Sequence, residues 1–201
     1  MRARLIAFVI AGFLIGAIAG AGVLLVANPQ GGQPVQSSGA ALIGGPFSLV
    51  GADGKPVTDR DFRERYMLIF FGFTHCPDIC PAELQVIAQA LEQLGDKAKN
   101  VVPIFITLDP PRDTPEHLKE YVAMFHTRFV GLTGDAAALD AAARAYRVYY
   151  ARVELEKSDY TVDHSAFIYL MGRHGEYLGF FPPGTPADIL VGTLKPLVAG
   201  R

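Results

Sequence analysis

The feature that most constrains the fold of this chain is a pair of cysteines placed between an apolar segment and an amphipathic one. Residues 66–73 (YMLIFFGF) form a near-continuous apolar run, which is typical of a strand buried on both faces of a sheet. Cys76 and Cys80 follow at once, and residues 82–94 then repeat apolar side chains at helical spacing. We therefore expect a buried strand, a loop that carries both cysteines, and a helix.

The rest of residues 46–201 alternates between strand-like and helix-like segments. We expect strands over residues 101–108, 129–132, 148–155, 164–170 and 177–181, and helices over residues 114–125, 135–146 and 186–197. A turn at residues 53–54 predicts a hairpin at the start of the domain. Strands that alternate with helices indicate a three-layer α/β fold with a mixed central sheet, and this order of elements is compatible with a thioredoxin-like fold.

The N-terminal region predicts a membrane anchor. Residues 5–27 are apolar and uncharged, and at about 1.5 Å per residue such a helix crosses a hydrocarbon core of about 30 Å. Arg2 and Arg4 precede the run, so residues 1–4 are expected in the cytoplasm and the remainder outside it. A cleaved signal peptide is the alternative, because residues 19–21 (AGA) fit a cleavage site. Residues 28–45 are rich in Gly, Pro, Gln and Ser and predict a flexible tether to a domain at residues 46–201.

The charge of the chain excludes one class of partner. Its 201 residues include 18 basic and 20 acidic side chains. Neither a basic patch nor an alternation of aromatic and basic residues is present, so we do not expect nucleic acid to bind.

The cysteine pair has three interpretations. Two thiols four residues apart at the start of a helix point to the same side, and the unpaired N–H groups of the helix favour thiolates. A disulfide across so short a loop would stabilise the fold little. The functional interpretations are a dithiol that exchanges disulfides, with Cys76 and Cys80 as the catalytic redox pair, and two thiolates that hold a soft metal such as Cu(I).

A metal would require a further ligand, and His164 is the histidine placed to supply it. His164 comes directly before the apolar residues 166–170, and in a thioredoxin-like sheet the start of that strand faces the cysteine loop. A capping role at this junction is the structural alternative. We expect His117, His126 and His174 to be surface residues, and His75 to point away from the sulfur of Cys76.

Together these residues resemble the Sco/SenC family of copper proteins, which serve assembly of the binuclear copper site of cytochrome c oxidase. The resemblance rests on the N-terminal anchor, residues 73–81 (FTHCPDICP), residues 108–115 (LDPPRDTP) and residues 163–165 (DHS). It implies a thioredoxin-like fold that binds copper, as Cu(I) or as Cu(II) with an additional oxygen ligand, through Cys76, Cys80 and His164. Asp109 matches an acidic segment near the metal loop, where it would support the ligands or dock the partner.

The resemblance implies a metallochaperone whose partners are the copper-site subunit of cytochrome c oxidase, other copper chaperones and thiol reductants. A bacterial inner membrane with the domain in the periplasm is the expected location, because no transit peptide precedes the anchor. The first rival function is a thiol–disulfide reductase that keeps the cysteines of a copper acceptor reduced, which would make the chain an enzyme and would not need His164. A thiol peroxidase is the third choice.

Overall fold

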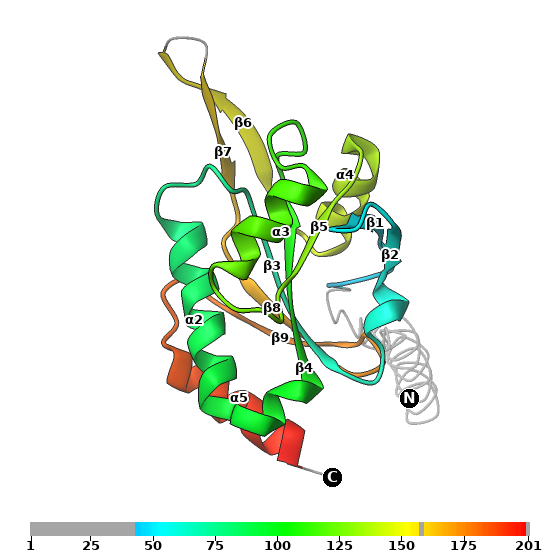
Figure 1. Ribbon diagram of the computed structural model, residues 1–201, viewed down its shortest axis with the longest axis vertical. Coiled ribbons are helices and arrows are strands. Elements are labelled where there is room, and N and C mark those ends of the chain that lie inside the picture. Colours follow the sequence, from blue (N-terminus) through cyan, green and yellow to red (C-terminus); the bar gives the residue numbers. More distant parts are fainter. Residues whose placement is uncertain (1–42, 157–158, 200–201) are drawn as a thin grey trace, which may run out of the picture. The chain divides into compact units, whose positions relative to one another are not determined.

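The computed structural model describes residues 43–156 and 159–199, which contain a mixed sheet flanked by helices (Figure 1). The sheet has seven strands in the order β2-β1-β5-β4-β3-β8-β9. These strands are β1 (Ser48–Gly51), β2 (Pro56–Thr58), β3 (Tyr66–Gly72), β4 (Val101–Thr107), β5 (Val130–Thr133), β8 (Ile168–Met171) and β9 (Tyr177–Phe181). Strands β3, β4 and β5 run parallel, whereas β1, β8 and β9 pair antiparallel with their neighbours. The expected mixed sheet is therefore confirmed.

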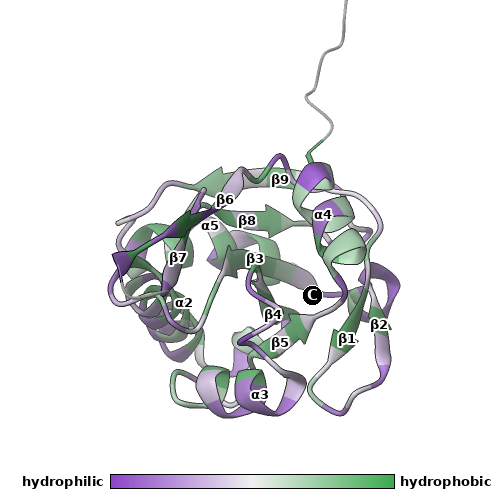
Figure 2. Ribbon diagram, turned by 90° about the horizontal axis from the view of Figure 1, so that it is seen from above, coloured by the Kyte–Doolittle hydropathy of each residue, from purple (hydrophilic) through white to green (hydrophobic). Residues whose placement is uncertain are grey.

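The helices form the outer layers. They are α2 (Ile79–Leu94), α3 (Pro115–Ala123), α4 (Ala136–Ala145) and α5 (Ala187–Ala199), with short 3-10 turns η1 (Asp59–Phe62) and η2 (Gly95–Asn100). Helices α2, α3 and α5 lie on one face of the sheet and α4 on the other (Figures 1 and 2). Thr114 and Asp135 cap α3 and α4, because each side chain accepts a hydrogen bond from a backbone N–H in the first turn. Helix α2 begins three residues earlier than the pattern predicted, and it includes Cys80.

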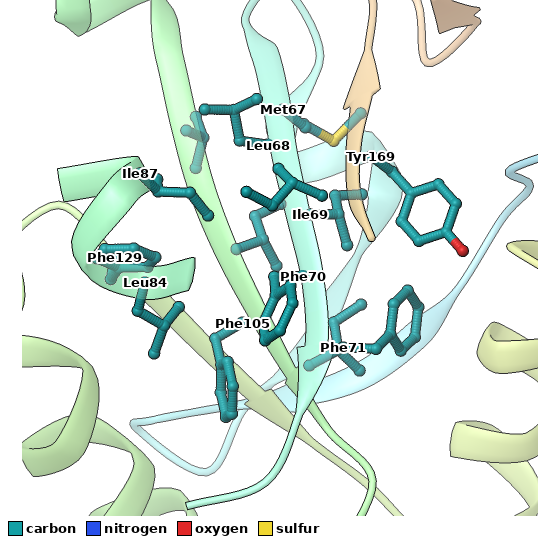
Figure 3. Close-up of a cluster of buried hydrophobic side chains, with 14 of the residues drawn as sticks. Met67, Leu68, Ile69, Phe70, Phe71, Leu84, Ile87, Phe105, Phe129 and Tyr169 are labelled. Atoms are coloured by element: carbon teal, nitrogen blue, oxygen red, sulfur yellow. The ribbon is translucent and has the colours of Figure 1, made fainter. Parts of the chain in front are cut away.

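The core explains why β3 is apolar throughout. Successive side chains of a strand point to opposite faces, and both faces of β3 are covered. Phe70 stacks on Phe105 on the side of α2 and α3, whereas Phe71 packs against Tyr146 and Tyr169 on the other side (Figure 3). Phe70 and Phe71 are fully buried, as a central strand requires.

One predicted boundary is wrong. Residues 164–170 do not form a single strand: His164 is the last residue of β7 (Tyr160–His164), and β8 starts only at Ile168. Strand β7 pairs with β6 (Tyr150–Glu154) to form a separate two-stranded sheet, in which His164 lies opposite Tyr150. This hairpin extends from the end of the sheet at which β3 leads into α2 (Figure 1). The chain leaves the main sheet here because β6 has mostly exposed side chains and no second face to bury.

The predicted anchor (residues 5–27) and most of the tether (residues 28–45) lie outside the described residues. Within residues 43–156 and 159–199, no helix has the length and apolar character needed to cross a membrane.

Candidate metal centre

The loop from β3 to α2 places both cysteines at the carboxyl end of the central strand. Cys76 precedes the helix and Cys80 lies in its first turn. The sulfur of Cys76 accepts the backbone N–H of Cys80 at 3.4 Å, so the open N-terminus of the helix faces that sulfur. Both cysteines are free thiols, and Cys80 is fully buried while Cys76 reaches the surface with 9% of its area. Cys76 and Cys80 do not form a disulfide in this structure.

Gly72 makes room for the buried sulfur. A Cβ atom at this position would lie 2.8 Å from Cys80 Sγ and 3.0 Å from the rings of Phe70 and Phe105. These distances are shorter than van der Waals contact, so any side chain at residue 72 would displace the sulfur or the two rings. The last residue of β3 is therefore part of the architecture of the cysteine site.

The Nε2 atom of His164 faces the cysteines. Its Nε2 atom lies 3.4 Å from Cys80 Sγ, and its Nδ1 atom lies 3.0 Å from the backbone carbonyl of Ser165. A carbonyl only accepts hydrogen bonds, so Nδ1 carries the proton and the Nε2 lone pair points to the sulfurs. The rings of Phe70 and Phe73 stand edge-on to the imidazole and hold its plane.

The sheet topology explains why a residue so distant in sequence reaches the loop. Strand β8 runs antiparallel to β3, and Ile168 at its start pairs with Phe70 near the end of β3. The segment before β8 therefore arrives beside the cysteine loop. One ligand atom of each of Cys76, Cys80 and His164 lies within 4.8 Å of the other two. The structure thus brings together the three residues predicted as ligands.

The two thiols differ sharply in acidity. The hydrogen bond from Cys80 is the largest of the effects that lower the pKa of Cys76 to about 4, and backbone N–H groups of Asp78 and Cys80 add to it. The same hydrogen bond, together with burial, raises the pKa of Cys80. The pair therefore shares one proton, which resides on Cys80, while Cys76 is a thiolate.

The buried carboxylate of Asp113 holds the cysteine loop against the end of β4. The carboxylate of Asp113 accepts hydrogen bonds from the backbone N–H of Thr74 (3.1 Å), from its hydroxyl (2.5 Å) and from the hydroxyl of Thr107 (2.6 Å). Asp113 is fully buried, so these three bonds satisfy a group that would otherwise be costly to bury. The end of β4 and the cysteine loop are joined through this one side chain.

Asp109 is not among the three converging residues. It is buried, and its carboxylate pairs with Arg112 and accepts a hydrogen bond from the hydroxyl of Tyr160 at 2.8 Å. The ring of Tyr160 is stacked between two guanidinium groups, 3.8 Å from that of Arg112 and 3.6 Å from that of Arg152. Asp109 thus ties the β6–β7 hairpin, which carries His164, to the loop after β4.

The sequence interpretation missed the environment of two other histidines. His75 and His117 meet at the hydroxyl of Thr74, which lies 3.2 Å from His75 Nδ1 and 3.0 Å from His117 Nε2. His117 was expected to be an ordinary surface residue. The sequence signal was the position of His117 near the start of the helix predicted over residues 114–125. In the structure its Nε2 atom reaches Thr74 of the cysteine loop at 3.0 Å.

Comparison with known proteins agrees with this geometry. The sequence model of the SCO1/SenC family matches residues 35–199. The chain is 46% identical over 155 residues to the mitochondrial SCO1 homolog 1 of Arabidopsis thaliana, a match that covers 77% of this chain and 46% of that protein. It is 43% identical to a SCO2-like protein of Rickettsia prowazekii, with 69% of each covered. The chain spans about half the length of the mitochondrial SCO1 homologs of Arabidopsis thaliana, Mus musculus and Homo sapiens.

The solved structures agree as well. Arabidopsis thaliana ScoI, solved with copper bound, superimposes with a TM-score of 0.74 at 42% identity, covering 79% of this chain and 99% of that one. The thioredoxin-like α/β fold with a mixed sheet is thereby confirmed. On the family match, the sequence identity and the fold together, this chain belongs to the SCO1/SenC family.

Proposed function

We propose that the chain is a copper metallochaperone, which binds copper through Cys76, Cys80 and His164 and delivers it to the binuclear copper site of cytochrome c oxidase during assembly. The observation that carries this proposal is the convergence of two sulfurs and one imidazole nitrogen within 4.8 Å of one another. Relatives of this chain solved with copper bound support the choice of metal.

The donor set suits the soft Cu(I) ion. Soft thiolate ligands favour the soft Cu(I) ion over hard divalent ions, and a neutral imidazole completes a three-coordinate site. Cys76 is already a thiolate and His164 already presents an unprotonated nitrogen, so only the proton on Cys80 must leave when copper binds. Cu(II) would require an additional oxygen ligand. Delivery would proceed as thiolate or imidazole ligands of the acceptor replace these three ligands one at a time.

Redox state would control the site. If a two-electron oxidant accepts two electrons from the copper-bound thiolates of Cys76 and Cys80, a sulfur–sulfur bond forms and both metal–sulfur bonds break. The disulfide form would then release copper and would need a thiol reductant before it could load again. This coupling makes thiol reductants a second class of partner, beside the copper-site subunit of the oxidase and other copper chaperones.

We also propose that residues 5–27 anchor the chain in a bacterial inner membrane, with residues 46–201 in the periplasm. The charge asymmetry around the apolar run and the similarity to Rickettsia proteins support this location. Fusions of a reporter that is active only outside the cytoplasm, placed after residue 45 and after residue 201, should both be active. Extraction of the chain by high salt would contradict the anchor.

Copper binding by the full-length chain tests the metal site. The reduced, anaerobic chain should bind one Cu(I) against a competing chelator, and His164→Ala should weaken this binding. His174→Ala is the matched control, because His174 is an exposed histidine after β8, at the end of the sheet where β3 begins and opposite to the cysteine loop. A reduced wild-type chain that retains no copper would overturn the proposal.

The same variant separates the chaperone from the thiol–disulfide reductase. A reductase needs Cys76 as the attacking thiolate and Cys80 as the resolving thiol, but it does not need His164. In a coupled assay with a soluble copper-site domain of the oxidase, His164→Ala should therefore abolish copper transfer. If transfer persists while reduction of the acceptor disulfide is the step lost in Cys76→Ser, the reductase becomes the leading function.

A further inference from the structure

A second cluster of metal-binding side chains lies next to the cysteine loop. One ligand atom of each of His75, Asp113 and His117 lies within 4.8 Å of the other two, and this group shares no residue with the cysteine site. The two imidazole rings are 6.2 Å apart between centroids. Both histidines are exposed, whereas the carboxylate between them is fully buried.

The three groups converge on a single hydroxyl. Thr74 Oγ1 lies 3.0 Å from His117 Nε2, 3.2 Å from His75 Nδ1 and 2.5 Å from Asp113 Oδ1. The hydroxyl has one proton, which it donates to the carboxylate, so both imidazoles must turn an N–H toward the same oxygen. Two exposed imidazoles and one buried carboxylate thus meet at the hydroxyl of Thr74 and are held there by these three hydrogen bonds.

The carboxylate has hydrogen bonds but no counter-charge. Asp113 accepts three hydrogen bonds from Thr74 and Thr107, yet no ion pair joins it to a basic side chain in the part of the chain that the structure describes. A buried carboxylate is normally paired with a cation or bound to a metal. A cation between the two imidazoles would supply the missing charge, and it would replace the two N–H contacts to Thr74 by metal–nitrogen bonds.

We propose that His75, His117 and Asp113 form a second metal site, which takes a divalent first-row transition ion. Rotation of the two exposed imidazoles would bring their nitrogens to the roughly 2.0–2.2 Å that such an ion requires. The donor set contains nitrogen and oxygen but no sulfur, and among the divalent ions Cu²⁺ binds such sets most tightly. This site therefore favours Cu²⁺ over Cu(I), whereas the thiolates of Cys76 and Cys80 favour Cu(I). It does not depend on the proposed chaperone function, because it uses none of the same ligands.

The test measures Cu²⁺ binding when the cysteine site is absent. The full-length chain with Cys76→Ser, Cys80→Ser and His164→Ala should bind one Cu²⁺ and show nitrogen splitting from two imidazoles in its electron paramagnetic resonance spectrum. Adding His117→Ala or His75→Ala should weaken binding by at least the roughly 10–100-fold that loss of a supporting residue costs a metal site. His174→Ala is the matched control, since that exposed imidazole lies 4.0 Å from the Glu64 carboxylate but has no second histidine, and it should change nothing.

The wild-type chain with its two cysteines oxidised to a disulfide gives the same test without substitutions in the first site. Binding that is lost in both His117→Ala and His75→Ala, and kept in His174→Ala, supports the second site. An oxidised chain that binds no Cu²⁺, or binding that persists unchanged in His117→Ala, overturns it.

Discussion

At the scale of the residue, Gly72 shows how one missing side chain fixes the position of a sulfur. Gly72→Ala would place a methyl group 2.8 Å from Cys80 Sγ and 3.0 Å from two phenylalanine rings. Overpacking of this kind should lower the free energy of unfolding by about 1–3 kcal/mol and weaken copper binding, because the ligand sulfur must move. Urea denaturation and copper titration of the same sample measure both effects.

Gly192→Ala is the control for Gly72→Ala. Gly192 lies within α5, and a methyl group at this position would meet no atom within 4 Å, so alanine should raise stability by about 0.5–1 kcal/mol through helix propensity. Copper binding should not change in this variant. If Gly72→Ala keeps both the stability and the copper affinity of the wild type, the close contact with Cys80 does not position the sulfur.

The acidity of Cys76 gives a prediction about pH. An acid whose pKa is lowered loses its proton at lower pH, so Cys76 should be a thiolate at neutral pH and regain its proton only as the pH falls through about 4. The ultraviolet thiolate absorbance of the reduced, metal-free chain should follow this titration. Cys80→Ala removes the hydrogen bond that contributes most, so its titration midpoint should move to higher pH. A wild-type midpoint near the ordinary cysteine value of about 8.5 would contradict the shared proton.

At the scale of the element, the β6–β7 hairpin is held in place by Asp109. Asp109→Ala would remove the buried partner of Arg112, leaving that largely buried charge only the exposed Asp159 at 3.5 Å, and it would remove the hydrogen bond from the Tyr160 hydroxyl. Breaking a buried ion pair in this way should destabilise the fold by about 3 kcal/mol, and looser attachment of the hairpin should weaken copper binding through His164. Thermal unfolding and copper titration test both effects. A variant with wild-type stability and copper affinity but no transfer to the acceptor would instead assign Asp109 to partner docking.

Glu154→Ala is the matched control on the same hairpin. Glu154 pairs with Arg152 on the exposed side of β6, where both side chains are more than half exposed. Surface ion pairs contribute little, so stability should change by less than about 0.5 kcal/mol and copper binding should be unaffected.

The sequence predicted some elements better than others, and the difference has a physical cause. The apolar run of β3 and the helical spacing of α2 follow from burial, which imposes a pattern on neighbouring residues. The strand predicted over residues 148–155 agrees with β6. Strand β7 extends beyond the core and buries only Val162, so it carries no such pattern, and the strand predicted over residues 164–170 starts four residues before β8. The meeting of His75 with His117 depends on tertiary packing of the cysteine loop against α3, which neither local segment encodes.

In the candidate site, too, the features set by neighbouring residues were predictable and those set by tertiary packing were not. Cys76 and Cys80 were recognisable because their spacing and their place between strand and helix are local features. The position of His164 could be expected only by assuming the strand order of the fold. Its tautomer could not, because the hydrogen bond from Nδ1 to the carbonyl of Ser165 depends on the local backbone geometry between β7 and β8.

At the scale of the whole molecule, copper should stabilise the fold only when the thiols are reduced. The ligands come from the β3–α2 loop, from the first turn of α2 and from the end of β7, so one ion would join three parts of the chain, the last of them distant in sequence. A ligand that binds only the folded state at 1,000 times its dissociation constant adds about 4 kcal/mol, which for a domain of this size raises the unfolding temperature by about 10 °C. Calorimetry of the reduced chain with and without Cu(I) should show this rise, and His164→Ala should show a smaller one.

The chain oxidised to the Cys76–Cys80 disulfide should unfold at the same temperature with and without Cu(I), because both sulfurs are then bonded to each other. An equal rise in the oxidised chain would mean that the stabilising copper lies elsewhere, and the assignment of the thiolate site would fail.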